Sequence, residues 1–347
     1  MLNIAIIGGG AAGFFTAITA KQKCSDARIT IFEQAKKVLA KVEISGGGRC
    51  NLTNSFADVT DLKQVYPRGF RLMKRLFKTF NHESTCQWFT SNGVALTIQD
   101  NQCVFPKSQN SHSVTDCLTA QARRLGIKVC TQHMLTSLKL LKNGDWELHF
   151  KEQQPLVFNR IAITTGGSPR LSGLQYLADM GHEIAMPVPS LFTFNVTDKA
   201  LRSLMGTVVG HAAVSIPSTK LRTTAELLIT HWGMSGPAIL KLSSHAARII
   251  SERGYHFPLS VNWIDGYHMA EIEEYLQETT VRNTQKQLSS IRPFGIPSRL
   301  WLHLLARVAM TFDKRWGDLS KKDIHRLTEV LTNDIYEVTG KGSFRDE

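Results

Sequence analysis

The chain has 347 residues, of which 42% are hydrophobic and 20% charged, so it is long enough for two or three globular domains. No uncharged stretch after residue 20 is long enough to span a bilayer, and we expect no membrane partner. The six cysteines lie within the first 130 residues and form no C-x-x-C pair. We therefore predict no metal site, reduced thiols and a cytoplasmic location.

The formal net charge of +12 is compatible with an anionic ligand or with a nucleic-acid partner. The densest basic segment spans residues 68–78, and its apolar residues recur at helical spacing. This pattern is typical of an amphipathic surface helix with a solvated basic face. Because no recognition motif accompanies the charge, we do not expect nucleic acid to be the partner.

The first 33 residues predict a strand, a turn, a helix and a second strand in one short unit. Residues 2–7 favour a buried strand, residues 11–22 a helix and residues 28–32 another strand. Residues 1–20 carry no charged side chain, so a signal peptide or a membrane helix is the alternative interpretation. The lack of a preceding basic segment and the three consecutive glycines weigh against both.

Gly8, Gly10 and Gly13 give this turn the spacing G-x-G-x-x-G, which is typical of dinucleotide-binding sites. The first glycine permits a tight turn, the second lets the backbone approach a pyrophosphate, and the third lets helix and strand pack closely. The free N–H groups of the following helix attract phosphate. Glu33 ends the second strand, where a carboxylate can accept hydrogen bonds from a ribose diol.

Residues 45–54 form a second glycine-rich segment, and they predict a loop that lies against an anionic or planar ligand. Three glycines precede Arg49 and Asn51, and Lys41 lies close enough in sequence to supply a cation. A plain flexible loop is the alternative. Nothing in the sequence indicates a lowered pKa for Cys50, so we interpret this cysteine as structural rather than redox-active.

The rest of the first half alternates helix-like and strand-like segments, which favours an α/β sheet. Residues 110–125 favour a helix with Ser113 as its N-cap and Asp116 in its first turn. The further predicted helices are residues 69–80 and 82–92, and the predicted strands are 127–130, 135–141, 146–150 and 161–164. The last strand runs into Thr165, Gly166 and Gly167, which again brings bare backbone close to a ligand.

The composition changes near residues 187–189. Residues 190–261 are rich in predicted strands, and residues 269–331 are mainly helical. Within the first of these segments, residues 226–238 predict a strand, a tight turn and a helix that starts near Pro237. His231 and Ser235 in this turn are a candidate base and nucleophile, but no G-x-S-x-G elbow is present. We interpret the turn as a structural or ligand-facing corner.

Together, these motifs resemble the BaiN/aminoacetone-oxidase-like family of NAD(P)/FAD-dependent oxidoreductases. The motifs that carry the resemblance are residues 8–13, Glu33, residues 41–54, 104–107, 165–167 and 230–238. The resemblance implies an α/β fold with a Rossmann-like FAD-binding domain, an inserted β-barrel-like domain and a small helical domain. The implied ranges are residues 1–189, 190–265 and 266–333, followed by a return strand toward the FAD domain in residues 334–347. The family pattern continues past residue 347 with a flavin-binding segment, so the resemblance also implies a shortened chain or an incomplete flavin site.

We therefore predict an FAD-dependent oxidoreductase that acts on a small molecule, with NAD(P)H as a candidate electron donor. The alternatives are an NAD(P)-dependent dehydrogenase that uses the N-terminal turn, and a non-enzymatic protein that binds flavin or nucleic acid. The sequence identifies neither the catalytic residues nor the oligomeric state. The predicted cofactor-binding residues are Gly8, Gly10, Ala11, Ala12, Gly13, Glu33, Gln34, Lys41, Gly46, Gly47, Gly48, Arg49, Cys50, Asn51, Met134, Thr165, Gly166 and Gly167.

Overall fold

The computed structural model describes residues 1–168 and 170–342. Contacts within the chain divide it into two compact units, Met1–Pro187 and Val188–Glu347. Within the described residues, no helix combines the length and the apolar character needed to cross a membrane.

The first unit is built on a four-stranded parallel sheet with the order β10-β1-β2-β6. Side chains of successive residues in β1 face opposite sides, so Ile6 belongs to one hydrophobic cluster and Ala5 and Ile7 to another. Burial on both faces is what a parallel sheet requires. The four strands are β1 (Asn3–Ile7), β2 (Arg28–Phe32), β6 (Lys128–Cys130) and β10 (Arg160–Ile163).

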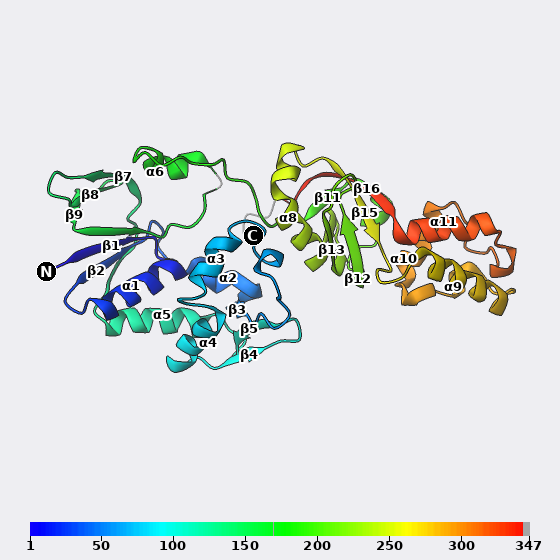
Figure 1. Cartoon of the computed structure of the whole chain (residues 1–347), viewed down its shortest axis with the longest axis horizontal. Helices are drawn as coiled ribbons and strands as arrows, with labels where there is room; N and C mark the ends of the chain where they lie inside the picture. Colours follow the sequence, from blue (N-terminus) through cyan, green and yellow to red (C-terminus); the bar gives the residue numbers. More distant parts are fainter. Residues whose placement is uncertain (169, 343–347) are drawn as a thin grey trace. The chain divides into compact units, whose positions relative to one another are not determined.

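Different elements cover the two faces of this sheet (Figure 1). Helices α1 (Ala11–Lys23) and α5 (His112–Arg124) pack together on one side through residues such as Phe14 and Leu118. On the other side, Leu148 and Phe150 pack against the sheet from a three-stranded antiparallel sheet. That sheet consists of β7 (Leu135–Leu140), β8 (Trp146–Phe150) and β9 (Leu156–Phe158).

The remaining elements of the first unit are short. They include a second small sheet with the order β3-β5-β4, whose strands have only two to four residues. The strands are β3 (Thr53–Asn54), β4 (Leu96–Ile98) and β5 (Cys103–Pro106), and the helices are α2 (Ala40–Gly48), η1 (Leu62–Gln64), α3 (Phe70–Leu76), α4 (His82–Ser91), η2 (Leu171–Leu174) and α6 (Gln175–Ala178).

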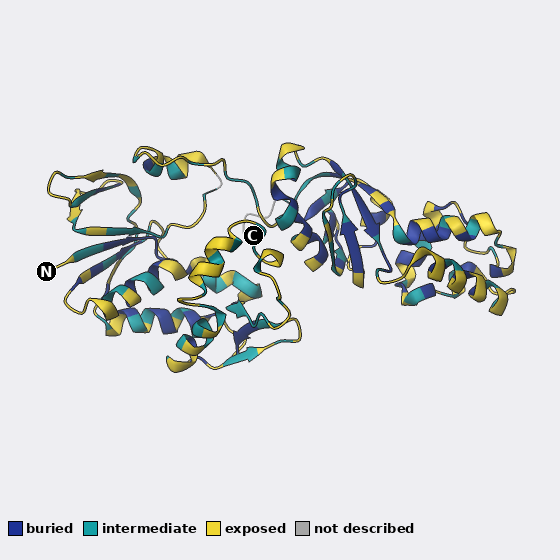
Figure 2. Cartoon of the chain, in the orientation of Figure 1, coloured by how far each residue is buried: buried dark blue, intermediate teal, exposed yellow. Residues whose placement is uncertain are grey.

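The second unit contains a closed barrel with the strand order β11-β14-β13-β12-β15-β16. Its strands are β11 (Phe194–Val196), β12 (Val208–Ser215), β13 (Arg222–Ile229), β14 (Gly233–Ser235), β15 (Phe257–Asn262) and β16 (Asp334–Lys341). Helix α8 (Pro237–Glu252) buries Ile239 and Leu242 in the barrel core, and the short α7 (Lys199–Arg202) follows β11. In Figure 2 the barrel strands are largely buried.

Helices fill the sequence between β15 and β16. Trp301 and Trp316 stack in parallel inside this helical part, with their ring centroids 6.2 Å apart, and both are fully buried. Figure 2 shows that the outer faces of these helices are exposed. The elements are α9 (Met269–Arg282), η3 (Leu288–Ser290), η4 (Pro293–Gly295), α10 (Ser298–Arg307), η5 (Trp316–Asp318) and α11 (Lys321–Thr332).

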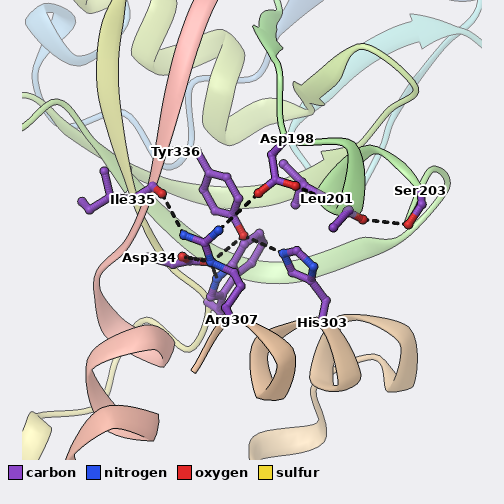
Figure 3. Close-up of polar contacts among 10 residues, drawn as sticks. Asp198, Leu201, Ser203, His303, Arg307, Asp334, Ile335 and Tyr336 are labelled. Atoms are coloured by element: carbon purple, nitrogen blue, oxygen red, sulfur yellow. Dashed lines mark hydrogen bonds and ion pairs between the residues drawn. The ribbon is translucent and has the colours of Figure 1, made fainter. Parts of the chain in front are cut away.

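A buried polar network joins α10 to β16 (Figure 3). The Asp334 carboxylate accepts hydrogen bonds from the Tyr336 hydroxyl at 2.5 Å and the Trp263 indole at 3.0 Å. The guanidinium of Arg307 pairs with Asp334 at 2.6 Å and lies 4.5 Å from the Tyr336 ring centroid. His303 Nε2 lies 3.1 Å from the Tyr336 hydroxyl oxygen. The Tyr336 hydroxyl donates its own proton to Asp334, so it must accept a hydrogen bond from His303. We therefore assign the tautomer of His303 that carries a proton on Nε2.

The structure confirms the predicted α/β class with a Rossmann-like domain, a β barrel and helices. Five barrel strands come from residues 190–265, and the sixth, β16, comes from residues 334–341 after the helices. The last residues of the predicted return strand, 343–347, lie outside the described residues. The predicted N-cap at Ser113 is wrong. Helix α5 begins at His112 after Ser111, and the Ser113 hydroxyl instead lies 2.7 Å from that of Ser108.

Candidate dinucleotide-binding site

A cavity of about 1190 Å³ lies within the first unit, where the carboxyl ends of β1, β2 and β10 meet. This is the edge at which parallel α/β sheets bind ligands. The volume exceeds the roughly 300–1,000 Å³ of an ordinary small-molecule site, so it is large enough for a dinucleotide. Of the predicted residues, those that line the cavity are Gly8, Gly10, Ala11, Ala12, Glu33, Gln34, Lys41, Cys50, Asn51, Met134, Thr165, Gly166 and Gly167.

Two glycines of the N-terminal turn are required by packing inside the protein. Gly8 has φ +113°, and a Cβ there would lie 2.5 Å from the Thr164 carbonyl oxygen. A Cβ on Gly13 would lie 1.9 Å from the carbonyl oxygen of Gly8, so no side chain fits where α1 crosses the turn. Gly13 does not line the cavity. Its effect on a ligand is therefore indirect, through the shape of the turn.

Gly10 differs, because the space beside it is open. Its backbone has φ −88°, and beyond the residues that flank it no described heavy atom lies within 4 Å of the position that a Cβ would take. Gly10 is the N-cap residue of α1, and among the described residues no side chain caps this end and no acid lies in the first turn. The N–H groups at the start of α1 therefore face the cavity with the partial positive charge of a helix N-terminus.

Glu33 is held at the end of β2 by two backbone amides. Its Oε2 accepts a hydrogen bond from the N–H of Gly9 at 2.7 Å, and its Oε1 accepts one from the N–H of Ala35 at 2.8 Å. Each carboxylate oxygen has a further lone pair, so the group can still accept from a ligand hydroxyl. The carboxylate thus orders the glycine turn and remains an acceptor at the cavity wall.

The glycine-rich segment makes a turn with left-handed backbone. Gly46, Gly47 and Gly48 have φ values of +58°, +68° and +80°. A Cβ on Gly46 would lie 2.6 Å from the Asn51 nitrogen, so only glycine fits there. Cys50 and Asn51 line the cavity, whereas Gly46, Gly47, Gly48 and Arg49 do not. These four residues belong to the turn that precedes the cavity wall, but they do not form its surface.

Two further groups at this wall bear on its chemistry. Lys41 lines the cavity and makes no hydrogen bond or ion pair with any described residue, whereas Lys37 pairs with Glu43. Lys41 therefore places a positive charge at the cavity wall. Burial raises the pKa of the Cys50 thiol, which disfavours the thiolate and agrees with a structural role for this cysteine.

The end of β10 closes another side of the cavity. The Thr164 hydroxyl donates to the carbonyl oxygens of Ile7 at 2.9 Å and Gly8 at 3.1 Å, which ties β10 to the glycine turn. The Thr165 hydroxyl lies 3.1 Å from that of Tyr176, and Gly166 takes a left-handed φ of +75°. Bare backbone therefore faces the cavity here, as the sequence predicts.

One wall of the cavity is aromatic, which the sequence did not predict. The ring of Phe15 lies 5.1 Å from the rings of both Phe80 and Trp88, and Phe15, Phe80 and Phe89 line the cavity. His133 also lines it, and its Nδ1 lies 2.7 Å from the Thr131 carbonyl oxygen. Helical spacing shows only that such phenylalanines face inward, not whether a protein core or a ligand covers them.

The second candidate motif lies in the other unit. His231 packs its ring 4.3 Å from that of Trp232, and its carbonyl oxygen accepts a hydrogen bond from Arg202. Ser235 ends β14 and pairs with Leu228 of β13. A Cβ on Gly236 would lie 2.9 Å from the Leu228 nitrogen, so this corner needs its glycine for packing.

Comparison with known proteins places this site in a family. A family model described as the HI0933-like protein Rossmann domain matches residues 2–288. A 3-dehydro-bile acid delta(4,6)-reductase of Clostridium scindens is 28% identical over 86% of this chain and 75% of its own length. Ribosomal RNA dihydrouridine synthases of Haemophilus influenzae and Escherichia coli are 24% and 23% identical over 98% of this chain and 82% of theirs.

Among solved structures, THI4 of Thermovibrio ammonificans is 13% identical, with a TM-score of 0.34, over 52% of this chain and 62% of that chain. The parallel sheet, glycine turn and acid at the end of β2 define a Rossmann-type domain. The family match and the reductase relative support the oxidoreductase class. Because the family model spans most of the chain, the protein belongs to the HI0933-like family. The resemblance to flavoprotein oxidoreductases that the sequence predicts is thereby confirmed.

Proposed function

We propose that the protein is an FAD-dependent oxidoreductase. The observation that carries the proposal is the open N-terminus of α1 at Gly10, which faces a cavity large enough for a dinucleotide. The N–H groups of this turn would bind the pyrophosphate, and Glu33 would accept hydrogen bonds from the adenosine ribose.

The rest of the cavity divides between the two halves of the cofactor. Gln34 and Met134, beside Glu33, would contact the adenine half. Lys41, Cys50 and Asn51 would contact the flavin half, together with the backbone of residues 165–167. FAD, when bound, supplies hydride and electron transfer, and the protein binds it, orients it and shapes its electrostatic surroundings.

The relatives suggest the type of reaction. A delta(4,6)-reductase and a dihydrouridine synthase are both named for chemistry at a carbon–carbon double bond. We propose that this protein likewise reduces a polarised double bond in a small molecule. The chain carries a single G-x-G-x-x-G turn after a strand, so NAD(P)H would act as a transient electron donor beside the flavin.

RNA is a second candidate substrate class. It is favoured by the net charge of +12 and by the exposed cations of α3, Arg71, Lys74 and Arg75. If RNA is the substrate, the purified protein would bind a ribosomal RNA fragment with an affinity that falls steeply with salt. If the protein does not bind the RNA fragment even at low salt, RNA is excluded as the substrate class.

The visible spectrum of the purified protein tests the proposal. Oxidised flavin is yellow and nicotinamide is not, so the spectrum separates an FAD enzyme from an NAD(P)-dependent dehydrogenase. Heat release followed by chromatography then identifies the cofactor. We expect FAD, and loss of the yellow colour when NADH or NADPH is added without oxygen. A colourless protein that gains no colour after incubation with FAD would contradict the proposal.

A further inference from the structure

Arg49 lies next to the cavity wall in sequence but does not line the cavity, whereas Cys50 and Asn51 do. Its guanidinium carbon lies 4.4 Å from the centroid of the Phe105 ring. Nε donates to the carbonyl oxygen of Gly46 at 3.2 Å, and Nη1 donates to Oε1 of Gln109 at 3.3 Å. The side chain is thus committed to three partners within the protein.

The turn that Arg49 contacts has a backbone that needs support. Left-handed φ values continue from Gly46 through Gly48, and Cys50 adopts φ +62° although it has a side chain. A non-glycine residue in this region is strained and persists only where its surroundings hold it. The N–H of Cys50 donates to Ser45 at 2.9 Å, and Gly48 accepts from the N–H of Ser111 at 2.9 Å.

We propose that Arg49 is a positioning residue that clamps residues 46–48 against β5 and Gln109 and so sets Cys50 and Asn51 in the cavity wall. The guanidinium carbon lies over the Phe105 ring, while Nε and Nη1 donate to two different acceptors. A lysine carries a single point charge on a flexible stem and cannot reproduce this arrangement. The effect on a ligand rests on the proposed function, because the wall is taken to hold FAD.

A double-mutant cycle between Arg49 and Phe105 tests the clamp. We expect Arg49→Ala to raise the dissociation constant for FAD about tenfold, because it removes both the cation–π contact and the hydrogen bonds. Phe105→Leu should raise it less, because it removes only the cation–π contact. The double variant should be no worse than Arg49→Ala alone, because the contribution of Phe105 acts through the guanidinium. Arg49→Lys should recover little of the loss. Lys63→Ala is the control, since this ammonium lies 4.9 Å from the Phe70 ring centroid and lines no part of the cavity.

Amide hydrogen exchange supplies a readout that needs no flavin. In the proposed arrangement Arg49→Ala speeds exchange in the segment 46–51, above all at the Cys50 amide, and shifts the visible spectrum of bound FAD. Loss of FAD affinity with unchanged exchange would mean that Arg49 contacts the ligand itself, which overturns the proposal. Unchanged affinity, spectrum and exchange would overturn it as well. If the unaltered protein binds no FAD, the proposed function fails, and exchange in Arg49→Ala still decides whether the clamp exists.

Discussion

Gly10 and Gly13 belong to the same turn, but different parts of the structure constrain them. Space is open beside Gly10, whereas a Cβ on Gly13 would lie 1.9 Å from a backbone oxygen. We expect Gly10→Val to fold normally and to bind FAD poorly, because the valine would occupy the path of the pyrophosphate. Gly13→Val should instead lower the melting temperature or prevent folding. Circular dichroism melts and flavin content measure both effects, and full flavin occupancy in Gly10→Val would refute the assignment.

The Glu33 carboxylate has two roles. It accepts hydrogen bonds that order the glycine turn, and it lines the cavity. We expect Glu33→Ala to weaken FAD binding roughly tenfold to hundredfold, which corresponds to the ~1.5–3 kcal/mol of a hydrogen bond to a charged group. Glu33→Gln should lose less, because its amide oxygen still accepts one hydrogen bond. Isothermal titration with FAD gives the dissociation constants. Equal constants for all three proteins would assign Glu33 to the surface rather than to the ligand.

At the scale of elements, the buried network between α10 and β16 holds the helical part to the barrel (Figure 3). The Asp334 side chain is 1% exposed, and three donors surround its carboxylate. Removing one member of a buried ion pair costs about 3–5 kcal/mol, so Asp334→Ala should lower the free energy of unfolding by an amount in this range. Urea denaturation measures it. The control is Glu278→Ala, which removes an exposed pair with Arg282 and should cost less than about 1 kcal/mol.

The same network predicts a pH dependence. Burial lowers the pKa of His303 from its ordinary value near 6.5; Arg307 lowers it further, and Asp198 raises it. The unfolded chain therefore takes up this proton at a higher pH than the folded protein does. Stability is fully present above the unfolded pKa and is lost as the pH falls through it toward the folded pKa.

We expect the free energy of unfolding to fall between about pH 7.5 and about pH 5.5, and to fall less in His303→Gln. Burial raises the pKa of Asp334, which acts in the opposite sense, so the difference between the two proteins isolates His303. Parallel pH profiles for the unaltered protein and His303→Gln would show that this histidine does not titrate with unfolding.

Elements with long periodic patterns could be predicted from the sequence, whereas short elements and long-range contacts could not. The strand 28–32 and the helices beginning at Pro237, Ser298 and Lys321 follow directly from apolar spacing and their first residues. Strands β3 to β5 are too short to show a period. The position of the Arg49 side chain depends on Phe105, which is distant in sequence, so a loop pattern alone could not show that this arginine does not line the cavity.

At the scale of the whole molecule, the chain carries one glycine fingerprint and one cavity that gathers most of the predicted cofactor-binding residues within the first unit. The second unit contributes a barrel closed by β16 after the helices. A single fingerprint accommodates a single tightly bound dinucleotide. The dinucleotide that this cavity prefers therefore decides the function of the protein.

The most direct test is an equilibrium titration of cofactor-free protein with FAD, in which NAD⁺ and NADP⁺ compete. We predict one FAD bound per chain, with neither nucleotide able to displace it at comparable concentrations. Glu33 would also repel the 2′-phosphate of NADP⁺. Displacement of FAD by an equal concentration of NAD⁺, or the absence of saturable FAD binding, would contradict the account.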